Sequence, residues 1–213
     1  TKLKDKILTV GTMVETAIAK SIASLTNMDS DLARAVIASD SEIDQMEVDV
    51  EEECLKILAL HQPVAANLRF VVAVLKINND LERMGDLAAN IAKRTIFLSE
   101  HRVPEFRFDF TQMARKAQSM VKRCLDVLVN ADTHLARKVC ADDEELNELR
   151  SEVKRLVFDE IKKQPEEAQA LMEIYAVARH LERLGDMSTN VAEDVIYMVE
   201  GSIIRHRLTE VPH

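Results

Sequence analysis

Acidic side chains recur at helical spacing in two neighbouring stretches of the sequence. In the later stretch Glu82, Asp86 and Asn90 are four residues apart, so they fall on one face of an α-helix. The earlier stretch places four acids at steps of four, three and four residues: Asp40, Asp44, Glu47 and Glu51. On a helical wheel the later column turns away from the apolar positions, and the earlier one lies on the shoulder of its apolar stripe. The two columns can therefore face each other if their helices are adjacent.

These columns carry a free-energy cost that a bound cation would offset. Like charges four residues apart destabilise an isolated helix by about 0.2–0.5 kcal/mol per pair, and facing columns add to that repulsion. Carboxylate and amide oxygens are ligands for hard cations such as Mg²⁺, Ca²⁺, Mn²⁺ or iron. The sequence therefore favours a metal site, although a solvated acidic face is the simpler alternative.

The later column occurs a second time in the chain. The hexapeptide Leu-Glu-Arg-(Met/Leu)-Gly-Asp stands at 81–86 and again at 181–186, which gives Glu182 and Asp186, and Asn190 matches Asn90. The positions that match the earlier column hold Asp143, Asn147, Arg150 and Lys154. Because this second set has fewer acids, we expect it to bind metal more weakly than the first.

Motifs for catalysis are scarce. A di-iron centre in a helical bundle uses Glu-x-x-His on facing helices, and the one such spacing here, Glu210 to His213, is interrupted by Pro212. The sequence contains neither His-x-x-x-His, nor a glycine-rich phosphate loop, nor a recognisable nucleophile motif. We therefore expect no enzyme, and a carboxylate-bridged metalloenzyme or a metal-storage bundle is the alternative.

Three repeated or scattered polar residues allow more than one reading. Arg83 and Arg183 either bind an anion such as phosphate or pair with a neighbouring acid. His180 takes the place of Asp80 in the second copy, and we expect its side chain to be exposed.

Composition predicts an all-α fold to carry these columns. Glycine and proline together number 8 of 213 residues, too few for the many turns that a protein with many strands needs, and there is no tryptophan.

The net charge of −9 argues against nonspecific binding to nucleic acid. Cys54, Cys124 and Cys140 lie among helix-periodic apolar residues, which indicates reduced core cysteines of a cytosolic protein. The longest uncharged run, 57–68, is too short to span a membrane.

Apolar periodicity defines the helices and an internal repeat. Heptad-like spacing runs through 3–25, 32–57 and 74–91, with Asp29 or Asp31 as an N-cap. Pro63 marks either the next turn or the first position of the following helix. The same pattern returns 103 residues later, and 100 residues later beyond the second turn. We predict two tandem three-helix bundles with six long helices, over 1–101 and 105–204, followed by a tail over 205–213. We attribute Gly85 and Gly185, both inside helices, to close helix approach rather than to a hinge.

The sequence resembles the PhoU family of bacterial phosphate-signalling regulators over essentially its whole length. The resemblance rests on the repeated hexapeptide, on Asp-Ser-Asp-Leu-Ala-Arg from Asp29, and on the acidic segment 46–54. PhoU-like proteins have two three-helix bundles and can carry metal ions or iron clusters on Glu/Asp-x-x-x-Asp motifs. Those motifs correspond here to Glu82/Asp86 and Glu182/Asp186, with Asp40/Asp44 and the altered pair Asp143/Asn147 on the partner helices. The implied cofactor is Fe, Mn, Mg, Ca or Zn.

The resemblance also implies a function and partners. It implies a non-enzymatic cytoplasmic adaptor that negatively regulates the phosphate regulon when phosphate is plentiful. The implied partners are the ATPase of the phosphate ABC transporter and the phosphate sensor histidine kinase. It further implies a homodimer that contacts the membrane only through these partners.

Overall fold

The computed structural model describes residues 2–101 and 110–202, and these are almost entirely helical. The first repeat consists of α1 (Lys2–Asn27), α2 (Ser30–His61) and α3 (Ala65–Glu100). The second consists of α4 (Phe110–Asn130), α5 (Thr133–Ala141), α6 (Asp143–Lys163), the short 3₁₀ helix η1 (Pro165–Glu167) and α7 (Ala168–Glu200). The predicted all-α class and its paired bundles are confirmed. The outer bounds predicted for the second repeat, 105 and 204, and the tail over 205–213 lie outside the described residues.

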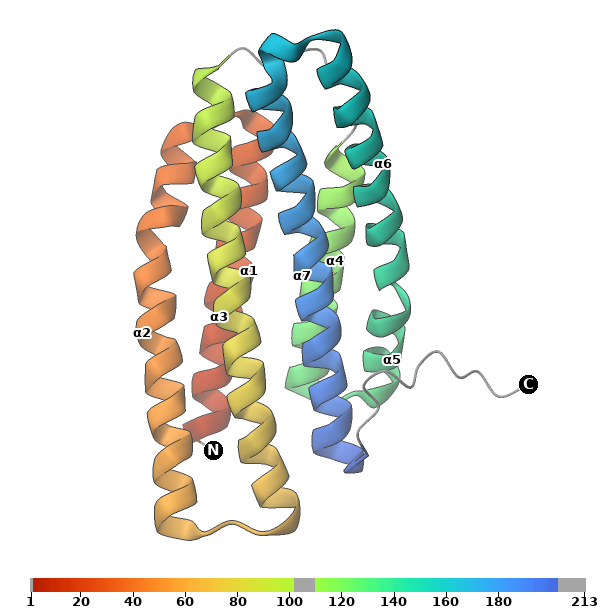
Figure 1. The fold of residues 1–213 in the computed structure, drawn as a ribbon. Coiled ribbons are helices and arrows are strands. Elements are labelled where there is room, and N and C mark those ends of the chain that lie inside the picture. The colour runs from red at the N-terminus through yellow and green to blue at the C-terminus, as the bar shows by residue number, and fades with distance from the viewer. Residues whose placement is uncertain (1, 102–109, 203–213) are drawn as a thin grey trace, which may run out of the picture.

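The two repeats lie side by side with their last helices at the centre. Figure 1 shows α3 in yellow and α7 in blue next to each other, with α1 and α2 on one side and α4, α5 and α6 on the other. These central helices run in opposite directions and pack against each other, and α1 also contacts α4. One continuous cluster of buried apolar side chains extends through both repeats. The molecule is thus a duplicated bundle with a shared core.

Each helix forms because apolar residues recur every three or four positions. In α1 the buried residues include Leu3, Ile7, Val10 and Val14, which follow that spacing. The first turn of α2 is capped as predicted by Asp29, whose carboxylate accepts hydrogen bonds from the backbone N–H groups of Asp31 and Leu32. Pro63 lies in the turn between α2 and α3. Within the described ranges, no helix is long and apolar enough to cross a membrane.

The sequence predicts one continuous fifth helix, but the structure has two helices in its place, α5 and α6. The helix is interrupted at Asp142, between α5 and α6. The Asp142 carboxylate lies 2.6 Å from Nη2 of Arg123 on α4, and its backbone N–H bonds to the carbonyl of Val139 rather than continuing the α-helical pattern. An ion pair to a neighbouring helix therefore accompanies the break.

The three cysteines belong to the packed interior. Cys54 and Cys124 are buried, Cys140 is half-buried, and all three are free. Burial raises the pKa of Cys54 to about 11 and those of Cys124 and Cys140 to about 12. Such thiols stay protonated at neutral pH, which fits structural rather than reactive cysteines.

Candidate functional site

The acidic columns of the first repeat face each other across the α2–α3 contact. Asp40, Glu47 and Glu82 are half-buried, whereas Asp44 and Asp86 are exposed. Both helices approach closely here, because Gly85 leaves room for Ile43 and for the Asp40 carboxylate, which lies 3.7 Å from where a Gly85 Cβ would be. The predicted facing of the two columns is thereby seen in the structure.

Electrostatic coupling shows which carboxylates are neighbours. Burial raises the pKa of Asp40, and the charges of Asp44 and Asp86 raise it further. Burial likewise raises the pKa of Glu82, with added repulsion from Asp86, Asp44 and Glu47. A raised carboxylate pKa means that the charged form is destabilised in the folded protein. The first column is therefore a concentration of negative charge, which the nearby Lys93 and Arg83 offset only in part.

Two residues predicted for this site lie at its margins. Lys93 donates a hydrogen bond of 3.5 Å to the amide oxygen of Asn90, so the oxygen of this expected ligand is already engaged. Glu51 is exposed and lies one helical turn beyond Glu47. Burial is the main cause that raises the pKa of Glu47, and the charge of Glu51 raises it further. The central group is thus Asp40, Asp44, Glu47, Glu82 and Asp86.

The second repeat brings together a smaller acidic group, which contains its own cation. Burial is the main cause that raises the pKa of Asp186 to about 6, and the charges of Glu182 and Asp143 add to it. Nη2 of Arg150 lies 3.4 Å from Oε1 of Glu182, and Asn147 donates a 3.2 Å hydrogen bond to Asp143 Oδ2. Asn147 and Arg150 stand where the first repeat has acids, and each pairs with a carboxylate of the second repeat: Asn147 with Asp143 and Arg150 with Glu182.

The donor chemistry of the two groups differs in its fit to a metal ion. The first group supplies only carboxylate oxygens, which suits a hard cation. The second contains the Arg150–Glu182 ion pair, although Oδ1 of Asp143 is buried without a hydrogen-bond partner among the described residues. As placed, no three or more His, Cys, Asp or Glu side chains in the described part of the chain are arranged to hold a metal ion. Binding would accordingly require these side chains to change rotamer.

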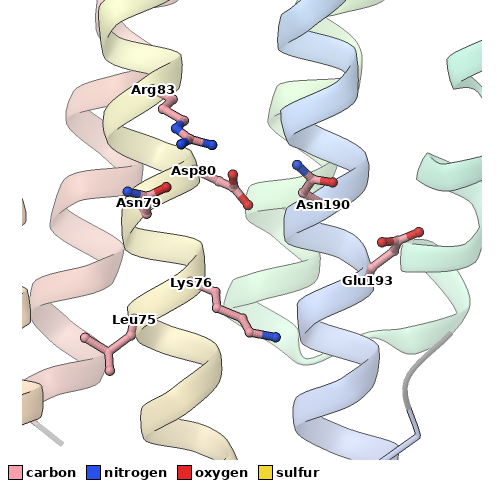
Figure 2. A pocket seen from close by; sticks show the side chains of 7 residues that line it. All are labelled: Leu75, Lys76, Asn79, Asp80, Arg83, Asn190 and Glu193. Carbon is pink, nitrogen blue, oxygen red and sulfur yellow. The ribbon is translucent and has the colours of Figure 1, made fainter. Parts of the chain in front are cut away.

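The central helices also enclose a polar cleft that the sequence reasoning missed. It has a volume of about 600 Å³ and is lined by Leu75, Lys76, Asn79, Asp80, Arg83, Asn190 and Glu193. Figure 2 shows Lys76, Asp80 and Arg83 reaching from α3 toward α7, which contributes Asn190 and Glu193. Asn190, predicted as a metal ligand, thus lines this cleft between the repeats. In the sequence, the signals for it are its charged residues, Lys76, Asp80, Arg83 and Glu193.

Ion pairs join α3 to α7 on this central contact. Nζ of Lys76 lies 3.3 Å from Oδ1 of Asp194, whose side chain is 3% exposed, and 5.3 Å from the centre of the Tyr197 ring. Nη1 of Arg94 lies 2.8 Å from Oε2 of Glu173. Positive and negative partners therefore hold the two repeats together along their contact.

His180 departs from the sequence-based expectation. The residue is half-buried, and both ring nitrogens are buried without a hydrogen-bond partner among the described residues, so the expectation that it is exposed is wrong. Burial, with the nearby charges of Arg94, Arg183 and Arg179, lowers the pKa of His180 to about 4. The imidazole is therefore neutral at physiological pH.

Fold and site together define a class of protein: a duplicated three-helix bundle with a strongly acidic column in its first repeat and a partly neutralised one in its second. A family model described as the PhoU domain matches the chain twice, over residues 7–95 and 110–195. This chain belongs to the PhoU family.

Known proteins agree with this assignment in sequence and in structure. A protein of Aquifex aeolicus named phosphate-specific transport system accessory protein PhoU homolog is 36% identical over 204 residues, which cover 96% of this chain and 92% of the relative. The crystal structure of PhoU from Pseudomonas aeruginosa matches with a TM-score of 0.91 at 33% identity, covering 94% of this chain and 97% of that one. The phosphate transport system regulatory protein PhoU from Streptococcus pneumoniae matches with a TM-score of 0.87 at 28% identity, covering 95% of each chain.

Proposed function

We propose that this chain is a non-enzymatic accessory protein of a phosphate transport system. In this proposal it acts in the cytoplasm as a negative regulator of the phosphate regulon, by linking the ATPase of the phosphate ABC transporter to the sensor histidine kinase. The observation that carries the proposal is the match of both repeats to the PhoU domain, together with relatives named as accessory or regulatory proteins of phosphate transport. The homodimer implied by the family resemblance is part of the same proposal.

Recovery of partners tests this function directly. Tagged protein is incubated with detergent-solubilised membranes from phosphate-replete cells of the same organism, and bound proteins are identified by mass spectrometry. We expect the transporter ATPase or the sensor kinase to be enriched over a tagged helical bundle of similar size and charge. Recovery of neither partner, with or without added Mn²⁺, Mg²⁺ or Fe²⁺, would contradict the adaptor role.

The proposal includes a cation at the acidic column of the first repeat. Asp40, Asp44, Glu47, Glu82 and Asp86 would hold the ion. Its positive charge would offset the burial and the added repulsion that raise the pKa values of Asp40 and Glu82. The second column has less need of an ion, because Arg150 already pairs with Glu182. Bound metal is therefore expected mainly in the first repeat.

Matched double variants test this asymmetry. Glu82→Ala/Asp86→Ala is expected to remove more bound metal than Glu182→Ala/Asp186→Ala, as measured by elemental analysis of protein equilibrated with one cation and then desalted. The two double variants remove identical side chains from equivalent positions, so each serves as the control for the other. Equal metal content in both would overturn the asymmetry.

A further inference from the structure

A cluster of basic residues lies where α3 meets the first half of α7. It consists of Arg94 from α3 and of Arg179, His180 and Arg183 from α7. The three arginine charges lie close enough to His180 to help lower its pKa. In a chain with a net charge of −9, three guanidinium groups around one imidazole are a local reversal of sign.

Most of the hydrogen-bonding capacity of this cluster is unused by the protein. Both ring nitrogens of His180 and Nε of Arg94 are buried without a hydrogen-bond partner among the described residues. Arg94 forms an ion pair with Glu173, whereas Arg179 and Arg183 are exposed and have no ion pair within 4.0 Å in the described ranges. A buried polar group without a partner costs free energy, so a ligand that accepts hydrogen bonds would be stabilising here.

The internal repeat supplies a comparison at equivalent positions. One hundred residues earlier, Asn79, Asp80 and Arg83 stand where the cluster has Arg179, His180 and Arg183. There the carboxylate of Asp80 lies in the polar cleft with Arg83 (Figure 2), so that end of the α3–α7 contact carries both signs of charge. At the other end Asp80 is replaced by a histidine and Asn79 by an arginine. The second end therefore has more basic residues than the first, although Glu173 pairs there with Arg94.

We propose that Arg94, Arg179, His180 and Arg183 form a binding site for a small oxyanion such as inorganic phosphate. Guanidinium groups bind tetrahedral oxyanions through charge-assisted hydrogen bonds, and the two exposed arginines can approach such an ion from the solvent side. An imidazole N–H of His180 and Nε–H of Arg94 would supply donors from the buried side once side-chain movement opens a path to them. A small oxyanion needs a narrower opening than an acidic protein surface does, so the burial of these atoms favours a free oxyanion. Arg183 stands between Glu182 and Asp186 in the sequence, and its charge offsets part of the rise in the pKa of Asp186, so this site borders the second acidic column. It does not depend on the proposed partners.

Titration with inorganic phosphate tests the site. Binding is followed by isothermal titration calorimetry and by the imidazole NMR signals of His180, at constant ionic strength and with EDTA so that no divalent cation can carry the phosphate. We expect saturable binding with shifts of the His180 signals. Arg179→Gln/Arg183→Gln should weaken it at least about tenfold, because a hydrogen bond to a charged group contributes about 1.5 kcal/mol or more. Both side chains are exposed, so this variant should keep its fold, which circular dichroism checks.

Arg83→Gln is the matched control, because Arg83 occupies the equivalent position of the first repeat. It should leave the affinity for phosphate unchanged. The proposal is overturned if no saturable binding occurs, if chloride at the same ionic strength gives the same His180 shifts, or if Arg83→Gln weakens binding as much as the double variant does. Binding of an acidic peptide but not of phosphate would also overturn it, in favour of a protein-docking surface.

Discussion

Asp186 is a single carboxylate that makes the folded protein sensitive to pH. Burial raises its pKa to about 6 from an ordinary value of 3.8, and Glu182 and Asp143 contribute further repulsion. Because the folded state binds the proton more tightly than the unfolded state, this residue costs stability as the pH rises from about 4 to about 6. Above that range the cost is fully present, and below it the cost is absent.

Replacing this carboxylate with an amide should therefore stabilise the protein in a pH-dependent way. We expect Asp186→Asn, with metal removed by EDTA, to raise the free energy of unfolding at pH 7.5 by up to about 3 kcal/mol, equivalent to about two pKa units. At pH 4 the gain should be close to zero. Denaturant unfolding at both pH values measures it, with Glu148→Gln as an exposed control. An equal effect at the two pH values would show that packing, not charge, is responsible.

The glycines of the two hexapeptide copies, Gly85 and Gly185, differ in how much room surrounds them. A Cβ at Gly185 would lie 2.7 Å from Cδ1 of the fully buried Leu146 and 3.2 Å from Oδ1 of Asp143, whereas at Gly85 the shortest distances are 3.2 Å, to Ile43. An alanine would gain up to about 1 kcal/mol in helix propensity at either position. Crowding in a packed core costs about 1–3 kcal/mol. We therefore expect Gly185→Ala to lower the thermal stability and Gly85→Ala to change it little; the same melting shift in both would contradict this.

At the scale of the helix, two equivalent turns begin α2 and α5. Met28 and Ala131, 103 residues apart, both adopt left-handed backbone angles with φ of 51° and 52°. The next residues, Asp29 and Asp132, then cap the following helices through hydrogen bonds of 3.0 and 2.9 Å to backbone N–H groups. The internal repeat thus preserves the helix-start geometry together with the apolar pattern.

Removing either cap should destabilise the protein by a similar amount. Asp29→Ala and Asp132→Ala are each expected to lower the free energy of unfolding by about 1 kcal/mol, because one or two backbone N–H groups lose their acceptor. Asp29→Asn and Asp132→Asn are the controls, since asparagine also caps helices well. Chemical denaturation measures all four. Equal losses for alanine and asparagine would point to charge rather than to capping.

The helices were predictable from sequence because their causes are local. Apolar spacing, the Asp29 cap and Pro63 act within a few residues, and the repeat offset extends the same prediction to the second half. The break at Asp142 was not predictable, since it accompanies an ion pair with Arg123 on another helix. The same holds for the pairing of Arg150 with Glu182 and for the burial of the His180 ring nitrogens. Facing acidic columns could be predicted, whereas the cleft between repeats depends on how α3 meets α7.

At the scale of the whole molecule, the two repeats share structure that neither could complete alone. The central helices α3 and α7 pack on each other, and α1 contacts α4. Buried residues of both repeats belong to one continuous cluster. Polar links cross the same contact, from Lys76 to Asp194 and from Arg94 to Glu173. Unfolding one repeat would expose the face of α3 or α7 that the other repeat covers.

This sharing predicts a single cooperative unfolding transition for the whole chain. Exposed apolar surface disfavours a half-unfolded state, so the calorimetric and van't Hoff enthalpies should agree. The two cap variants report on opposite repeats, since Asp29 begins α2 and Asp132 begins α5. Asp29→Ala and Asp132→Ala should each move the same transition without splitting it, as followed by calorimetry and circular dichroism. Two resolved transitions, with each variant moving only one of them, would show that the repeats unfold independently despite their common core.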